Sequence, residues 1–188
     1  TDPVSGTTTY AYDLASGNLS SVTNALGQAT LYSDYTPQGK PGKMTDPNGL
    51  QTLFTYDQRD RVTEVKTGTP GGHWETLSIS YTPYGSVREM TRLDGTWVKY
   101  TYDSARRVTQ VQDPRGKMVL TLDNNGDVLK QEVFDLNNIL VLKATSAYDS
   151  YRRTQAQIDA NNKATSFLYL DSSERVIWQT DPDQPNPD

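Results

Sequence analysis

The strongest constraint on the fold of this chain is a short motif that recurs every 20 to 26 residues. Each copy begins with a Tyr or Leu followed by Asp or Thr, at Tyr12-Asp13, Tyr35-Thr36, Tyr56-Asp57, Tyr81-Thr82, Tyr102-Asp103, Leu122-Asp123, Tyr148-Asp149 and Leu170-Asp171. We call these pairs the anchors. Eight copies in phase indicate an internal repeat, and a repeat of this length is typical of one supersecondary unit that stacks on its neighbours.

Two further landmarks keep the same phase. After each anchor comes a turn, which is usually followed by a basic residue and Val, as in residues 60–62 and 106–108. A return turn closes most units, and its clearest form is Asp-Pro-x-Gly, at Asp46, Pro47 and Gly49 and again at Asp113, Pro114 and Gly116. The opening "TDPVSG" reads as the tail of a preceding unit. Residues 1–188 are therefore interpreted as one array of about eight units, cut from a longer repeat region.

One unit reads as strand, tight turn, strand, turn. The stretch "VKYTYD" at 98–103 is rich in β-branched and aromatic residues, and Tyr100 and Tyr102 fall on one face of a strand. Asp103 follows, where a carboxylate can accept the backbone N–H two residues on. Two strands and two turns need roughly 20 residues, which matches the period. The sequence predicts an all-β fold of tandem antiparallel β-hairpins, joined into a wide, curled sheet with one continuously buried face.

Two stretches do not fit this scheme directly. Val62 and Val65, like Val108 and Val111, are three residues apart and cannot share a face of a regular strand, so we expect a β-bulge or a strand end there. Residues 144–158 show helical spacing of their apolar side chains. That stretch is nevertheless in phase with the other units and carries the polar Gln155 on its apolar stripe, so we predict strands.

Composition limits the class of protein. The chain has 188 residues and a mean hydropathy of −0.72, but its 10% aromatic content argues against disorder. A net charge of −5 with scattered basic residues argues against a nucleic-acid partner. No apolar run approaches the length of a membrane span, and no secretory signal opens the sequence. The absence of Cys excludes disulfides and thiolate metal sites.

At the anchors and return turns the chain resembles the Rhs (rearrangement hotspot) or YD-repeat family. "YDSARRVTQVQDPRG" and "YTPQGKPGKMTDPNG" match its pattern well, "LDNNGDVLKQEVFDLNN" and "YDSYRRTQAQIDANN" are drifted copies, and the resemblance covers about residues 10 to 182. It implies a β-spiral wall of a hollow shell that encloses a C-terminal toxin in an exported bacterial polymorphic toxin used in interbacterial competition. The partners would then be flanking YD repeats and the enclosed toxin, outside or on the surface of the cell.

The candidate chemical sites favour structural interpretations. Some family members cleave themselves at a paired Asp-Pro-x-Gly signature, but "DPNGL" at 46–50 matches only its second half, so Asp46 is interpreted as a turn residue. The single histidine, His73, lies in an insertion expected to be a solvated loop. "DNNGD" at 123–127 lacks the Gly and Glu spacing of a calcium loop and is predicted to be a hairpin turn. We expect no catalytic residue, metal or cofactor.

Two functions remain open at this stage. The first is a non-enzymatic wall segment, and the second is a secreted or cell-surface module that recognises glycans or other cells. Aromatic residues repeating along one face could stack on sugar rings, although stacking of Arg106 or Arg107 on neighbouring Tyr rings is favoured. Because the two outer strands of such an array carry unpaired backbone groups, we also expect self-association through the sheet edges.

Overall fold

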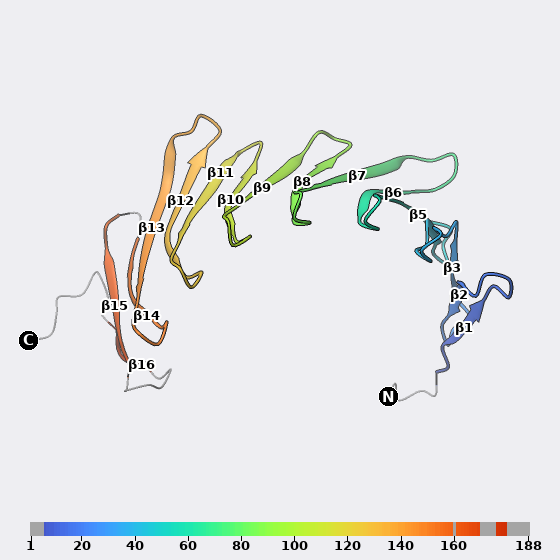
Figure 1. The fold of residues 1–188 in the computed structure, drawn as a ribbon, viewed down its shortest axis with the longest axis horizontal. Coiled ribbons are helices and arrows are strands. Elements are labelled where there is room, and N and C mark those ends of the chain that lie inside the picture. The colour runs from blue at the N-terminus through green and yellow to red at the C-terminus, as the bar shows by residue number, and fades with distance from the viewer. Residues whose placement is uncertain (1–5, 160, 170–175, 180–188) are drawn as a thin grey trace, which may run out of the picture. The chain divides into compact units, whose positions relative to one another are not determined.

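A computed structural model of the chain describes residues 6–159, 161–169 and 176–179 (Figure 1). Within this part the structure has strands and turns and no helix. The chain divides into two compact units, Thr1–Thr96 and Trp97–Asp188, which are described separately. The predicted all-β fold of tandem antiparallel hairpins is confirmed.

The described part of the first unit contains eight strands, each antiparallel to the next along the chain. They are β1 (Thr9–Tyr12), β2 (Leu19–Thr23), β3 (Ala29–Ser33), β4 (Lys43–Thr45), β5 (Gln51–Tyr56), β6 (Val62–Gly68), β7 (Trp74–Tyr81) and β8 (Val87–Arg92).

The second unit repeats this arrangement with eight more strands. They are β9 (Trp97–Tyr102), β10 (Val108–Asp113), β11 (Gly116–Leu122), β12 (Val128–Asp135), β13 (Leu140–Tyr148), β14 (Thr154–Ile158), β15 (Ala164–Tyr169) and β16 (Val176–Gln179). The stretch with helical spacing falls in β13 and β14, so the prediction of strands there is confirmed.

The predicted β-bulges are present and follow the anchors. Val62 pairs with Tyr56 and Glu64 pairs with Thr55, which leaves Thr63 as the extra residue. In the second unit the same shift leaves Thr109 extra. The hydroxyl of Thr63 donates to the Thr55 carbonyl at 3.3 Å, and this hydrogen bond links the bulged residue to the partner strand. The extra residue shifts by one position the alternation of side chains between the two faces of the sheet. Val62 and Val65 therefore both lie on the same face as Tyr56.

One turn geometry recurs eleven times in the described residues. The N–H of its first residue donates to the carbonyl four residues on, and the N–H of its fourth residue donates back to the first carbonyl. The fourth residue has a left-handed backbone, with φ between 58° and 97°, at Gly27, Gly39, Gly49, Asp60, Gly85, Gly95, Arg106, Gly126, Asn138, Arg152 and Asn162. The segment 123–127 is one of these turns, as predicted.

The two Asp-Pro-x-Gly motifs form different turns. Gly49 takes the expected left-handed position with φ 83°. Gly116 instead pairs directly with Asp113 across a two-residue loop, and its φ is 153°. A Cβ added to Gly116 would lie 2.0 Å from the Phe134 carbonyl oxygen, so a side chain there would collide with strand β12. Glycine is required at this position because of close backbone approach.

The two faces of the sheet differ in polarity. In the second unit, direct cross-strand pairing places Tyr100, Val111, Met118, Val133 and Leu142 in one row. The opposite face carries polar pairs such as Lys130 with Thr145. No hydrophobic side chain among the described residues is fully buried. The expectation of a continuously buried face is therefore wrong for these residues, because a single-layer sheet has no second layer to cover it.

Candidate functional site

The acidic residue of the anchor organises its own turn. One carboxylate oxygen of Asp57 accepts the N–H groups of Arg59 at 2.8 Å and Arg61 at 3.0 Å. Both bonds recur at the anchor residues Asp123 and Asp149 and at the return-turn residues Asp46, Asp135 and Asp159. At the anchors with Thr, the Thr36 and Thr82 hydroxyls each accept the N–H four residues on at 3.2 Å. A side-chain oxygen that accepts backbone N–H groups is therefore the shared requirement at this position.

The second carboxylate oxygen binds an arginine four residues on. The closest contacts are 2.5 Å for Asp57–Arg61, 2.7 Å for Asp103–Arg107 and 2.6 Å for Asp149–Arg153. The Arg61 side chain, and then its backbone N–H, lower the pKa of Asp57 from 3.8 to about 2. The pKa of Asp103 is lowered first by the backbone N–H of Arg107 and then by its side chain, and the pKa of Asp149 is lowered first by the side chain of Arg153 and then by its backbone N–H. These carboxylates are therefore ionised and held in place at neutral pH.

The anchor tyrosine connects its hairpin to the preceding one. Its hydroxyl donates to a carbonyl at or just before the start of the second strand of that hairpin, usually six residues after the previous anchor. The distances are 2.5 Å for Tyr35 to Leu19, 2.9 Å for Tyr56 to Pro41, 2.7 Å for Tyr81 to Val62, 3.1 Å for Tyr148 to Val128 and 2.7 Å for Tyr169 to Thr154. Burial raises the pKa of Tyr35 and of Tyr56, so their hydroxyls remain protonated donors.

Arginine completes this contact between hairpins. The guanidinium carbon of Arg61 lies 4.3 Å from the ring centroid of Tyr81, and Arg153 lies at the same distance from Tyr169. Arg61 thus binds Asp57 in its own turn and stacks on the tyrosine of the next hairpin, whose hydroxyl returns to Val62. We call this closed set of contacts the hairpin clasp.

The clasp changes where the next anchor is Leu122. Leucine offers no aromatic ring and no hydroxyl, so Arg107 donates instead to the carbonyls of Asp123 at 2.8 Å and Asn124 at 3.3 Å. The prediction that Arg106 or Arg107 stacks on neighbouring Tyr rings therefore does not hold for Arg107 at the next anchor, and for Arg106 it stays a prediction. The stacking occurs at the corresponding arginines of other repeats.

The two ends of the array depart from the alignment of anchors. Tyr12 comes first, and its side chain is 59% exposed. Asp13 caps a turn that is one residue longer, and accepts the N–H of Ser16 at 2.8 Å. At the other end the strand register and the hydroxyl bond identify Tyr169 as the anchor, one residue before the predicted Leu170. Asp171 lies outside the described residues.

The choice of Tyr over Phe at the anchors could have predicted the hydrogen bond made by the tyrosine hydroxyl. The chain contains three Phe, yet no anchor is Phe. A ring needed only for packing would accept Phe as readily as Tyr, so a position restricted mostly to Tyr indicates that the hydroxyl is used.

The residues considered for other chemistry each have an ordinary structural setting. His73 is exposed in the β6–β7 connection. Asp127 binds Arg152 at 2.7 Å. Within the described residues no group of three or more His, Cys, Asp or Glu side chains is arranged to hold a metal ion. The described part of the chain also has no helix with the length and apolarity needed to cross a bilayer.

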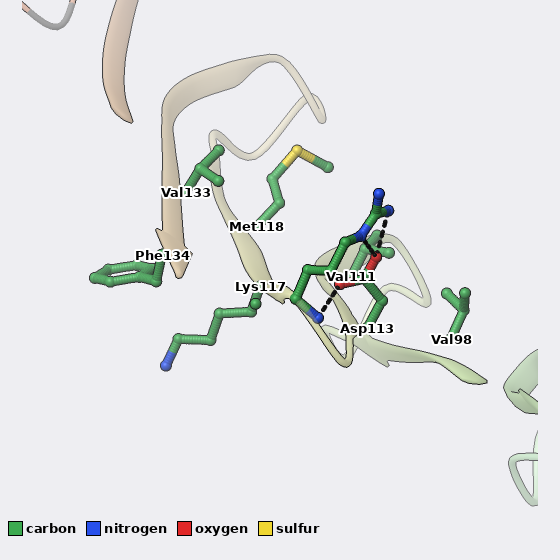
Figure 2. Close-up of a pocket in the computed structure, with 9 residues that line it drawn as sticks. Val98, Val111, Asp113, Lys117, Met118, Val133 and Phe134 are labelled. Carbon is green, nitrogen blue, oxygen red and sulfur yellow. Dashed lines mark hydrogen bonds and ion pairs between the residues drawn. The ribbon is translucent and has the colours of Figure 1, made fainter. Parts of the chain in front are cut away.

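A hollow of about 320 Å³ lies on the apolar face of the second unit. Figure 2 shows Met118 and Val133 close together there. Asp113 and Arg115, which form an ion pair, also line the hollow. Lys117 and Phe134 point to the other side, where the Lys117 ammonium lies 4.9 Å from the ring centroid. The hollow has an apolar floor and lacks the convergent polar groups of an active site.

Comparison with known proteins agrees with this architecture. The sequence matches the family model described as Teneurin YD-shell over residues 4–172. Solved structures of TcdB2-TccC3-Cdc42 and TcdB2-TccC3 are similar, with TM-scores of 0.61 and 0.59, and each is 17% identical over 74% of this chain. The chain spans 7% of the length of those solved chains. No curated protein was found to match the sequence. On the extent of the family match, the chain belongs to the Teneurin YD-shell family.

Proposed function

We propose that this chain is a non-enzymatic wall segment of a YD-repeat shell that encloses a C-terminal toxin domain of the same protein. The parent protein would be exported, and flanking repeats would continue the wall on both sides. The single observation that carries this proposal is the hairpin clasp, in which the Tyr, Asp and Arg side chains of the recurring motif have their partners within the sheet.

The clasp occupies the carboxylate and hydroxyl groups that could act as acids or bases in an enzyme. The Asp57 carboxylate is occupied by two backbone N–H groups and Arg61, and the Tyr81 hydroxyl is occupied by Val62. A general acid or base must be free to exchange a proton with a substrate. These contacts support a structural role for the recurring Tyr and Asp residues.

The single-layer sheet also suits a wall. Its apolar row is half-buried, so it can contact an enclosed polypeptide without forming one deep pocket. Strand β1 pairs with β2 within the described residues, and its other side offers backbone groups to a flanking strand. Self-association of the isolated chain through such edges follows from the same feature.

Glycan recognition receives no specific support from the aromatic residues. The ammonium of Lys99 lies 4.4 Å from the ring centroid of Trp97. The Trp74 ring packs so closely on Gly68 that a Cβ added to this glycine would lie 2.7 Å from it. Each of these two rings already has a contact within the sheet on one face, so neither is a ring that is open on both sides.

Protease protection tests the proposal. The parent protein, with its flanking repeats and C-terminal domain, is treated with protease and the survival of that domain is followed. We expect the domain to survive when the repeats are intact and to be degraded when it is expressed without them. Equal rates of degradation in the two forms would contradict the wall. Saturable, selective glycan binding that is lost on Trp97→Ala would favour the recognition module instead.

A further inference from the structure

A second hollow, of about 510 Å³, lies in the first unit between the turn that follows β5 and the turn that follows β7. Three arginines line it, Arg59, Arg61 and Arg88, together with one carboxylate, Asp57. Three guanidinium groups against one carboxylate leave an excess of positive charge. Such an excess is unexpected in a chain whose net charge is −5.

The carboxylate in this hollow already has its partners. One oxygen of Asp57 accepts two backbone N–H groups, and the other accepts the Nε of Arg61 at 2.8 Å and its Nη2 at 2.5 Å. Asp57 therefore has little capacity left for Arg59 or Arg88.

In the described part of the chain, Arg61 has one N–H donor without a hydrogen-bond partner, whereas the same donor of the corresponding residue Arg107 has two. Nη1 of Arg107 donates to the carbonyls of Asp123 and Asn124 in the next turn. The residue that corresponds to Asn124 is Pro83, and its carbonyl is taken by Nη1 of Arg59 at 2.9 Å. Nη1 of Arg61 is buried and has no hydrogen-bond partner among the described residues.

Arg88 adds an accessible donor at the same place. It is the extra residue of the bulge in β8, since Val87 pairs with Tyr81 and Glu89 pairs with Ser80. Its side chain is exposed and makes no hydrogen bond or ion pair with the described residues. Arg88 thus brings an unpaired, exposed guanidinium to the hollow, beside Arg61, whose buried Nη1 also has no hydrogen-bond partner among the described residues.

We infer that this hollow is a binding site for a single oxyanion, a carboxylate or a phosphate. Guanidinium groups present paired N–H donors that match the oxygen spacing of both anions. The anion could arrive free in solution or on an acidic side chain of a polypeptide. The inference goes beyond the wall role and does not depend on it, because it rests on the local surplus of donors.

The test is a titration of the 188-residue chain followed by NMR. The probes are inorganic phosphate, the capped tripeptide Gly-Glu-Gly and the capped tripeptide Gly-Gln-Gly. We expect saturable shifts in residues 57–61 and 82–88 with phosphate, with the Glu peptide or with both, and none with the Gln peptide. Binding of phosphate alone would assign the site to a free anion, and binding of the Glu peptide would assign it to a polypeptide carboxylate. Absence of binding by both would overturn the inference.

Substitutions locate the site. Arg59→Gln with Arg88→Gln should weaken binding at least about tenfold, because charge-assisted hydrogen bonds are lost. Arg115→Gln is the control, since Arg115 is 91% exposed and pairs with Asp113 in the other unit. Should the double variant fail to fold, Arg88→Gln alone takes its place. Unchanged affinity in the Arg59 and Arg88 variants, or an equal loss with Arg115→Gln, would refute the site.

Discussion

At Asp60 the backbone has a φ of 58°, whereas the corresponding residue in most of the other turns is glycine. A left-handed backbone costs an L-residue about 1 kcal/mol, and less for Asp, which tolerates it. Asp60→Gly should therefore raise the free energy of unfolding by about 0.5 kcal/mol, since relief of strain exceeds the added flexibility of the unfolded chain. Urea denaturation measures this difference.

Gly49→Ala is the matched reverse change. A Cβ added there meets no atom within 4 Å, so the substitution probes the backbone alone. We expect a loss of about 1 kcal/mol, because φ at Gly49 is 83°. A stabilised Gly49→Ala variant would show that the turn does not need a left-handed residue.

The Asp57–Arg61 pair predicts a pH dependence of stability. The pKa of Asp57 is 3.8 as a free side chain and about 2 in the folded chain. A lowered folded pKa contributes stability that is fully present above pH 3.8 and is lost as the pH falls toward 2. Asp57→Asn should thus be less stable than the native chain at neutral pH, and its stability should depend less on pH in this window. Thermal unfolding at a series of pH values measures both effects.

Asp46→Asn provides the control for the charge. Asp46 accepts the backbone N–H groups two and four residues on, at 2.9 and 2.8 Å, as Asp57 does in its own turn. An Asn side-chain oxygen can accept both. We expect its stability at neutral pH to stay close to that of the native chain. Equal losses for Asp46→Asn and Asp57→Asn would show that the arginine pair adds nothing to the turn.

Between neighbouring hairpins, the tyrosine hydroxyl is the smallest group that can be removed. Tyr81→Phe keeps the ring under Arg61 and removes the donor to Val62, so we expect a loss of about 1 kcal/mol. Tyr10→Phe is the control, because Tyr10 is 57% exposed and its hydroxyl makes no hydrogen bond with the described residues. Equal stability of the two variants in urea denaturation would contradict the clasp.

The period of the repeat defines which deletions preserve the fold. Removing residues 103–122 joins Tyr102 to Asp123, which restores a Tyr-Asp anchor and lets β9 take the place of β11 beside β12. Removing residues 103–115 joins β9 directly to β11 without a turn, so strand alternation is broken. The first variant should keep a cooperative unfolding transition and a β-type circular dichroism spectrum, and the second should lose both. Two equally well folded variants would argue against the hairpin as the unit.

The sequence predicted the hairpins, the bulges and most turns, because these depend on local spacing and backbone preferences. The spacing of Val62 and Val65, three residues apart, predicted a β-bulge or a strand end, and the structure has a bulge with Thr63 as the extra residue. The hydroxyl bond from Tyr81 to Val62 was missed, since the two residues are 19 positions apart and meet only through sheet register. The arginine-lined hollow was missed for the same reason. The half-buried apolar face was not anticipated, because stacking hairpins edge to edge adds strands and no second layer.

Across the whole molecule, the outer strands predict association. Strand β1 has exposed side chains, including Tyr10 and Tyr12, and a backbone edge that can accept another strand. We expect the average mass of the 188-residue chain in light scattering to rise with concentration. Substituting Pro for Ala11, at the centre of β1, should reduce this rise, because Pro lacks the N–H needed for strand pairing and bends the edge. A strictly monomeric chain at high concentration would count against open edges.

The most direct test of the wall is a cryo-electron microscopy structure of the parent protein. The account predicts that these residues form part of a continuous sheet, with β1 and β16 both paired to strands of flanking repeats and with density for the C-terminal domain enclosed by that sheet. A structure in which residues 6–179 form a separate surface module, with both edges free and no enclosed domain, would contradict it.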